Sequence, residues 1–216
     1  MNRISLEESK KIKIFNRFES KYIIDHDDIL NIIRLLENDY LLVEENNKII
    51  FGYHSLYFDT PELNMWNDHN IDKPSRQKIR IREYDDKSKF LEIKEKIDGK
   101  TIKTRIPIES YFINDEEQWI SDNLKYDTKN LIKSLDVKYN RISFVKKDKT
   151  ERITLDIDIE YYNYKTNKRW KSNKNFAILE IKKNKEENNE IEDIINKEYI
   201  FKQKYSKYYW GILKTK

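Results

Sequence analysis

The chain has 216 residues, a length that suits one large domain or two small ones. Its 43 Lys and Arg residues nearly balance 39 Asp and Glu residues, and the net charge of only +4 argues against a general nucleic-acid coat protein. The absence of cysteine excludes a disulfide framework, a zinc–thiolate site and a thiol nucleophile, and three glycines are too few for a Walker loop or a Rossmann fingerprint.

Aromatic residues make up 13% of the chain, which predicts a folded domain although 38% of the residues are charged. No apolar stretch approaches the ~20 residues that cross a bilayer. The N-terminus lacks the apolar core of a signal peptide. We therefore expect a cytoplasmic protein without a membrane segment of its own.

The first elements alternate between strands and helices. Residues 1–13 are polar, and we expect a flexible N-terminus. Residues 15–24 predict a strand, and residues 25–38 predict a helix with Asp25 as its N-cap and apolar residues at helical spacing. A strand over 52–58 and a short helix over 61–69 follow.

A basic strand comes next. Every second residue from Arg76 to Arg82 is Arg or Lys, and Ile79 and Ile81 lie between them. Because alternate side chains of a strand share a face, this segment lines one face with cations about 7 Å apart. Like charges at that spacing repel each other, so the face is expected to bind a strongly and repeatedly negative ligand.

The same alternation continues along the chain. Residues 90–97 and 101–106 have a charged and an apolar face, and Asp98-Gly99 between them predicts a two-residue hairpin turn. Helices are then predicted over 114–124 and 129–135, strands over 137–146, 150–163 and 175–183, and a helix over 190–200. A basic, aromatic tail covers 202–213. No linker interrupts the pattern, so residues 14–216 are expected to form a single domain.

The charged faces allow two interpretations. For any one strand, a solvated outer face over a buried core is the simpler explanation. Taken together, the strands are richer in Arg and Lys at fixed phase than solvent faces usually are. The alternative is therefore a barrel with a polar lumen and an apolar exterior covered by helices.

Nine segments in this order resemble the VTC domain, the catalytic domain of polyphosphate polymerases within the triphosphate tunnel metalloenzyme (CYTH-like) superfamily. The segments are residues 17–22 (RFESKY), 55–61 (SLYFDTP), 76–84 (RQKIRIREY), 90–94 (FLEIK), 103–105 (KTR), 139–141 (YNR), 152–156 (RITLD), 179–182 (LEIK) and 204–208 (KYSKY). Each segment is weak evidence alone, but nine in order are specific.

The resemblance implies an α+β fold built on a closed antiparallel β-barrel, a tunnel with a charged lumen and helices packed on the outside. It also implies a set of functional residues. The catalytic residues would be Lys21, Arg80, Arg82, Lys94 and Glu180. Further phosphate-binding residues would be Lys103, Arg141, Arg152, Lys204, Lys207 and, as a hydroxyl donor, Ser206. Glu180 would bind Mn²⁺ or Mg²⁺, with Glu19 as a second candidate ligand. Arg76, Lys78, Lys96 and Arg105 lie in phase and are less firmly assigned, since solvated surface charges explain them equally well.

The activity implied is a phosphotransfer from ATP to a growing inorganic polyphosphate chain. Where the superfamily's triphosphatases begin with Glu-x-Glu-x-Lys, this chain has Arg17-x-Glu19-x-Lys21, which removes a metal-ligating carboxylate and favours the polymerase branch. Glu92, Asp156, Asp158 and Glu160 are interpreted as counter-ions, with Asp158 and Glu160 left open as metal ligands. The three histidines show no ligand spacing and are interpreted as surface or structural residues.

Three alternatives stay open. The first is a metal-dependent inorganic triphosphatase of the same fold, acting on tripolyphosphate. The second is a polyphosphate-binding module without catalysis. The third is single-stranded nucleic-acid binding on a cationic, aromatic groove, although no specific nucleic-acid signature accompanies it. The resemblance also leaves open a membrane-protein partner.

Overall fold

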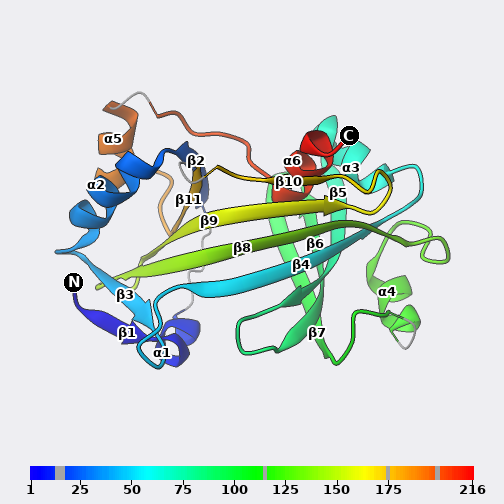
Figure 1. The fold of residues 1–216 in the computed structure, drawn as a ribbon, viewed down its shortest axis with the longest axis horizontal. Helices are drawn as coiled ribbons and strands as arrows, with labels where there is room; N and C mark the ends of the chain where they lie inside the picture. The colour runs from blue at the N-terminus through cyan, green and yellow to red at the C-terminus, as the bar shows by residue number, and fades with distance from the viewer. Residues whose placement is uncertain (13–17, 114–115, 174–175, 198–199) are drawn as a thin grey trace. The chain divides into compact units, whose positions relative to one another are not determined.

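The computed structural model describes residues 1–12, 18–113, 116–173, 176–197 and 200–216. Within these residues the chain forms eleven strands and six helices, an α+β architecture whose strand pairs with a defined register are antiparallel except β1 with β3 (Figure 1). The chain divides into two compact units, each assembled from three separate stretches of sequence.

Unit 1 comprises residues 1–51, 139–159 and 172–205. Its hydrogen-bonded strand order is β2-β11-β9-β8, and β8 also pairs with β3. Its elements are β1 Arg3–Ser5, α1 Leu6–Lys11, β2 Phe18–Ile24, α2 His26–Leu36, β3 Tyr40–Glu44, β11 Ala177–Lys183, α5 Glu190–Lys197 and parts of β8 Ile132–Lys146 and β9 Glu151–Asn163.

The core of unit 1 lies between its sheet and two helices. Tyr22, Ile153 and Leu179 point from three neighbouring strands to the same face, where Ile32 of α2 and Ile195 of α5 cover them. α2 and α5 lie side by side in Figure 1. The alternate residues of the same strands, including Lys21 and Glu180, therefore share the opposite face.

Unit 2 comprises residues 52–138, 160–171 and 206–216. Its strand order is β8-β4-β5-β6-β7, and β10 pairs with the end of β9. Its elements are β4 Phe51–Asp59, α3 Asn64–Asn70, β5 Ser75–Glu83, β6 Lys89–Ile97, β7 Lys100–Ile108, α4 Glu117–Asn123, β10 Arg169–Lys171 and α6 Lys207–Lys214, with the beginning of β8 and the end of β9.

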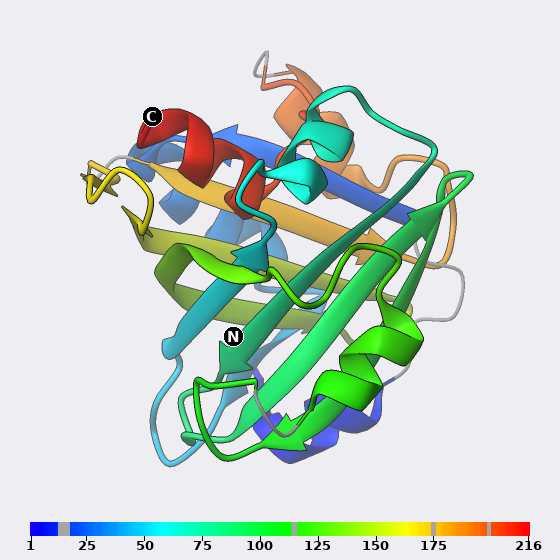
Figure 2. The same cartoon turned by 90° about the vertical axis from the view of Figure 1, so that its right-hand side faces the viewer.

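The core of unit 2 follows the same rule. Leu56, Ile79 and Ile93 line one face of β4, β5 and β6, and Ile120 and Leu124 pack onto that face from α4 and the residue after it (Figure 2). The expected arrangement, with an apolar face covered by helix and a charged face opposite, is confirmed in both units.

The expected closure of the sheet into a barrel is wrong for the described residues. The strand order has two ends, β2 in unit 1 and β7 in unit 2. β7 is exposed over most of its length and carries Lys100, Lys103, Arg105 and Pro107, side chains that are typical of an edge strand protected from further pairing.

One further expectation is corrected. Residues 129–135 do not form a helix, because β8 begins at Ile132 and buries Leu135, Val137 and Tyr139 at the period of a strand. Near the N-terminus, β1 pairs with β3, and α1 begins at a capping box between Ser5 and Glu8. The described part of the chain contains no helix that is long and apolar enough to span a membrane.

Candidate functional site

The charged face of β5, β6 and β7 in unit 2 forms what we call the basic face. Strand pairing places side chains in rows across it, and one row consists of Lys78, Lys94 and Lys103 directly opposite one another. The neighbouring row consists of Arg80, Glu92 and Arg105. Like charges directly opposite are destabilising, so the basic face concentrates positive charge at an energetic cost.

Glu92 is the buried counter-ion of this face. Its side chain is only 1% exposed, and Arg80 donates to Glu92 Oε2 from Nη2 at 2.7 Å and from Nε at 3.0 Å. Lys103 forms an ion pair with Glu92 Oε1. Burial alone would raise the pKa of Glu92, but Arg80, Arg82 and Lys103 hold it well below the usual carboxyl range. The prediction that Glu92 is a counter-ion is confirmed.

The pKa of Lys103 is shifted by burial and by the same neighbouring charges. Burial lowers its pKa to about 8, with Arg80 and Arg82 adding to the effect and the ion pair with Glu92 opposing it. Its ammonium group therefore loses its proton at lower pH than an ordinary lysine does. Lys94, which lies between Lys78 and Lys103 in the row, is exposed.

β4 supplies polar partners that orient the two central arginines. Arg80 Nη1 donates to the hydroxyl of Tyr57 at 2.9 Å, and Arg82 Nε donates to Ser55 Oγ at 3.2 Å. Burial opposes ionisation of Tyr57, yet Arg80 and Arg82 lower its pKa. Sequence reasoning assigned Tyr57 no role, although its place in the SLYFDTP segment and its alternation with Leu56 were a usable signal.

The N-terminal end of α6 adds to the basic face. Ser206 caps the helix by accepting from Tyr209 N at 3.4 Å, and its hydroxyl also accepts from Lys78 Nζ at 2.8 Å. Lys207 is the first residue of α6, and its charge contributes to the lowered pKa of Tyr57. Four of the predicted unit 2 residues thus lie on β5 to β7, and Ser206 and Lys207 join them from α6. Lys204 lies in unit 1, where it is exposed.

The charged face of unit 1 centres on Glu180. We call the group formed by Glu180, Lys21, Lys182, Arg141 and Asp156 the Glu180 cluster. Glu180 is 8% exposed and lies directly opposite Lys21 in the pairing of β11 with β2. Lys182 Nζ is 2.8 Å from its Oε1, and Arg141 Nη2 is 3.7 Å from its Oε2. Although burial opposes ionisation, these cations hold the pKa of Glu180 well below its usual value.

Arg141 is fixed within this cluster. It grips the fully buried Asp156 with two bonds, Nε to Oδ1 at 2.6 Å and Nη2 to Oδ2 at 2.8 Å. Such bidentate pairs fix the guanidinium plane. Asp156 is therefore a counter-ion, as predicted. The Glu180 cluster resembles the basic face, since buried carboxylates hold several cations close together.

Other predicted residues occupy varied positions. Glu19 forms an ion pair with Lys21, and Arg152 Nη2 donates to the carbonyl of Ser9 in α1. Asp158 is exposed and accepts from Asn140, and Glu160 forms an ion pair with Lys171. Arg17 of the predicted strand lies outside the described residues.

The less firmly assigned cations also differ from one another. Arg76 is buried and bound to Asp72 Oδ1 at 2.6 Å. Arg105 lies over the ring of Phe90 at 4.5 Å from its centroid, and Lys96 is directly opposite Arg76. Lys78 donates from Nζ to the hydroxyl of Ser206, the N-cap of α6.

The fit of a divalent ion depends on oxygen donors. Among the described residues there is no group of three His, Cys, Asp or Glu side chains that could hold a metal. Mg²⁺ is often bound through one or two carboxylates, with substrate phosphates and water completing the shell. Glu180 fits that arrangement as a single protein ligand, and Glu19, diagonal to it across the β2–β11 pair, is a second carboxylate on the same face.

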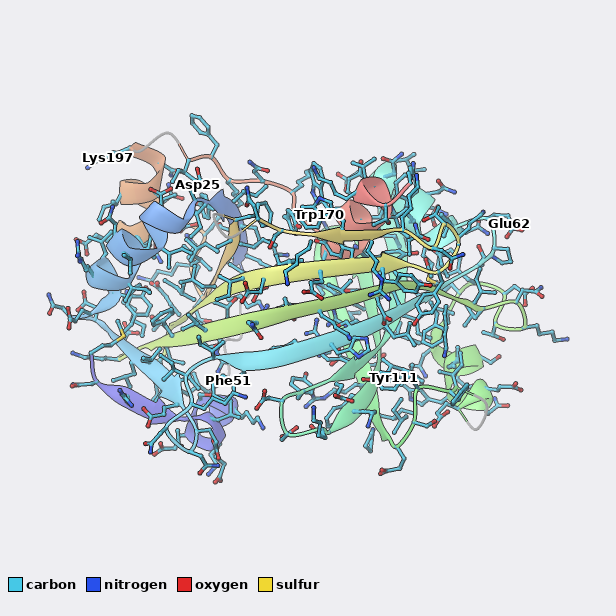
Figure 3. The ribbon with its side chains drawn as sticks, in the orientation of Figure 1. Asp25, Phe51, Glu62, Tyr111, Trp170 and Lys197 are labelled. Atoms are coloured by element: carbon cyan, nitrogen blue, oxygen red, sulfur yellow. The ribbon has the colours of Figure 1, made fainter. Side chains whose placement is uncertain are left out.

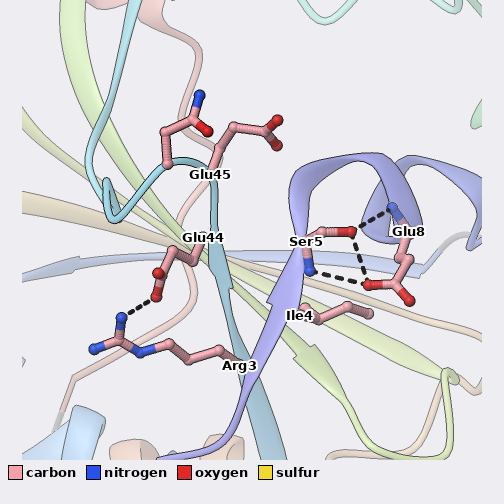
Figure 4. Close-up of a pocket in the computed structure, with 7 residues that line it drawn as sticks. Arg3, Ile4, Ser5, Glu8, Glu44 and Glu45 are labelled. Atoms are coloured by element: carbon pink, nitrogen blue, oxygen red, sulfur yellow. Dashed lines mark hydrogen bonds and ion pairs between the residues drawn. The ribbon is translucent and has the colours of Figure 1, made fainter.

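A shallow hollow in unit 1 lies outside these clusters. It is lined by residues of β1, α1 and β3 and the turn that follows, with the capping box of Ser5 and Glu8 on one side and the ion pair of Arg3 with Glu44 on the other (Figure 4). None of the predicted site residues lines it.

His54 belongs to a polar network on the other face of unit 2. Its Nδ1 lies 2.8 Å from the hydroxyl of Tyr111, which Figure 3 labels, and its Nε2 lies 2.6 Å from Asp136 Oδ1. Its neighbours Leu56 and Phe58 in the same phase of β4 belong to the apolar core. These contacts agree with the interpretation of His54 as a surface or structural residue.

The comparisons with known proteins decide the family. The model of the VTC domain matches residues 16–216, more than nine-tenths of the chain. The chain belongs to the VTC domain family. No curated protein sequence matches it.

Solved structures with the same fold are distant in sequence from this VTC domain. HpAC1 from Hippeastrum, an adenylyl cyclase by name with a dominant triphosphatase activity, superimposes with a TM-score of 0.57 at 14% identity, covering 93% of this chain and 97% of that one. PH1819 from Pyrococcus horikoshii OT3 has a TM-score of 0.53 at 14% identity, covering 91% and 96%. At such identity the likeness shows the fold alone.

Proposed function

We propose that this VTC domain acts in polyphosphate metabolism as an ATP-dependent polyphosphate polymerase. The observation that carries the proposal is the basic face, where three lysines stand directly opposite one another and a single buried carboxylate, Glu92, holds Arg80 and Lys103. A chain of phosphates is a ligand of matching, repeated negative charge. Residues 14–216 are proposed to act as one functional domain.

Phosphoryl transfer asks for positioning and charge stabilisation rather than covalent chemistry by the protein. Arg80 and Arg82 would grip phosphate oxygens, since a guanidinium presents a planar fork of donors. Lys94, Lys103 and Lys207 would add point charges along the phosphates, and Ser206 a hydroxyl donor. In unit 1, Lys21, Arg141, Arg152 and Lys204 are proposed for the same task.

The proposed reaction joins two phosphates. An oxygen of the terminal phosphate of the growing chain attacks the γ-phosphorus of ATP in line. The bond from that phosphorus to the bridging oxygen breaks, and the electron pair leaves with ADP. Mg²⁺ or Mn²⁺, held by Glu180 and completed by phosphate oxygens, would supply charge neutralisation during transfer.

Substitution at two positions tests this proposal. Arg80→Ala removes a guanidinium from the basic face, and Glu180→Gln removes the proposed metal-ligating charge. We expect both variants to lose polyphosphate synthesis from ATP and Mn²⁺, measured on a gel stained for polyphosphate, while circular dichroism shows a folded protein. A full polymer yield from either variant contradicts the assignment of that residue.

A further inference from the structure

Asp59, at the end of β4, is fully buried and surrounded by donors. Its Oδ1 accepts from the backbone amides of Thr60 at 2.8 Å and Met65 at 2.9 Å, and its Oδ2 accepts from the amide of Trp66 at 3.0 Å. These bonds tie the first turn of α3 to the end of β4. These three backbone donors are enough for Asp59 to act as a cap for the start of α3.

A fourth donor comes from α6. The hydroxyl of Tyr208 donates to Asp59 Oδ2, and 149 residues separate the two in sequence. Burial and the neighbouring carboxylate raise the pKa of Tyr208, so its hydroxyl keeps the proton that it donates. The same oxygen lies 3.1 Å from Ser134 Oγ. The bond from Tyr208 to Asp59 therefore connects α6 to the end of β4 and is not needed to cap α3.

The position of Tyr208 links this contact to the basic face. Its ring stacks on Tyr57, with centroids 4.8 Å apart and planes inclined by 18°. Tyr57 accepts from Arg80, and the two residues that precede Tyr208 in sequence are Lys207 and the helix cap Ser206. Figure 1 shows α6 and α3 side by side, which agrees with their contacts.

We propose that Tyr208 and Asp59 are positioning residues that hold the N-terminal end of α6, and with it Ser206 and Lys207, in place on the basic face. The inference rests on the proposed function, because it assigns these residues an effect on the binding of phosphate chains. Neither residue touches the phosphate. Their bond fixes where the hydroxyl of Ser206 and the ammonium of Lys207 stand.

The test compares two Tyr→Phe variants of the full chain. Tyr208→Phe removes the hydroxyl and keeps the ring that stacks on Tyr57. Tyr126→Phe is the matched control, because the Tyr126 hydroxyl donates to Asp68 Oδ2 at 2.6 Å in the same unit, on the apolar side of the sheet. A hydrogen bond to a charged group contributes enough for about a tenfold effect.

Isothermal titration with tripolyphosphate gives the readout. We expect Tyr208→Phe to weaken binding about tenfold and Tyr126→Phe to leave the affinity unchanged, even where both lower the melting temperature. Equal affinities of Tyr208→Phe and the unaltered chain overturn the inference. Failure of the unaltered chain to bind tripolyphosphate contradicts the proposed function instead, so the two failures are distinguishable.

A double-mutant cycle separates positioning from general destabilisation. If Tyr208 acts through Lys207, the loss caused by Tyr208→Phe should shrink to about twofold or less in a Lys207→Ala background. It should persist in a Lys103→Ala background, since Lys103 stands on β7, pairs with Glu92 and is separated by β6 from Lys78, which bonds to Ser206. The same loss in both backgrounds contradicts the role assigned to Tyr208.

Discussion

Glu92 shows at the scale of single residues how the basic face is kept folded. Its carboxylate is nearly inaccessible to water and satisfies Arg80 and Lys103 together. Charges buried in this way stabilise little in net terms, but removing one partner leaves the others uncompensated. Under the proposed function, a polyphosphate chain would add further negative charge beside these cations.

The first prediction concerns Glu92→Gln. We expect a loss of about 3 kcal/mol in the free energy of unfolding, the typical cost of breaking a buried ion pair, and a tighter affinity for tripolyphosphate. Urea denaturation with and without tripolyphosphate measures both effects. Glu160→Gln is the control, because the Glu160–Lys171 pair is exposed and should contribute well under ~1 kcal/mol. Weaker tripolyphosphate binding by Glu92→Gln would argue against an anion-binding face.

The depressed pKa of Glu92 also has a consequence for acid stability. A carboxyl whose folded pKa is below its unfolded value, ~4.3 for Glu, contributes stability that is present above that value and is lost as the pH falls below it. The unfolding free energy of the unaltered chain should therefore fall more steeply below about pH 4 than that of Glu92→Gln. Parallel curves for the two proteins would contradict the assignment.

Lys103 leads to a prediction at the alkaline end. Because its pKa is lowered to about 8, its charge is present at lower pH and is lost as the pH rises through that value. We expect tripolyphosphate affinity, measured by titration calorimetry, to fall between pH 7 and 9. Lys103→Arg should remove this part of the pH dependence, since an arginine stays charged. Identical pH profiles for the two proteins would show that Lys103 does not contribute charge to binding.

At the scale of elements, β5 to β7 were the most predictable part of the chain. Their alternation of charged and apolar residues specified the strands, and Asp98 and Gly99 form the turn with positive φ values of 47° and 85°, as a two-residue hairpin requires. The same alternation correctly divided the side chains between two faces. It could do so because the side-chain period of a strand is a local property.

Other elements depended on contacts that the sequence does not reveal. β3 was not predicted, and its pairing with β1 and β8 joins segments far apart in the chain. At Asp158 the backbone φ is 52° and the side chain is exposed, which the alternation of β9 did not predict. The bond between Asp59 and Tyr208 lay beyond sequence reasoning for the same reason, since only folding brings the two together.

A prediction for α6 follows from how closely it packs. A Cβ atom at Gly211 would overlap with Leu135 Cδ2 and lie 2.9 Å from Tyr161 Cδ1. Gly211→Ala should therefore displace α6, lower the free energy of unfolding by about 1–3 kcal/mol and weaken tripolyphosphate binding. Leu213→Ala is the control on the same helix, because Leu213 is 40% exposed. An unaltered melting temperature in Gly211→Ala would contradict the packing described.

At the scale of the whole molecule, the two units share one chain in an interleaved way. Each is assembled from three stretches of sequence, and β8 and β9 contribute to both. A single cut in the chain would therefore isolate neither unit. The VTC match extends over residues 16–216 and thus includes both the basic face and the Glu180 cluster. Functional experiments accordingly need the full chain.

The proposed activity is tested most directly by the products that the unaltered full chain makes. The chain is incubated in one reaction with ATP and Mn²⁺ and in a second with tripolyphosphate and Mn²⁺. Polyphosphate is resolved on a gel, and orthophosphate is measured in both reactions. The polymerase proposal predicts long chains from ATP that increase with time, together with ADP. Orthophosphate from tripolyphosphate without any polymer from ATP would contradict it and identify a triphosphatase, and binding without either product would identify a non-catalytic module.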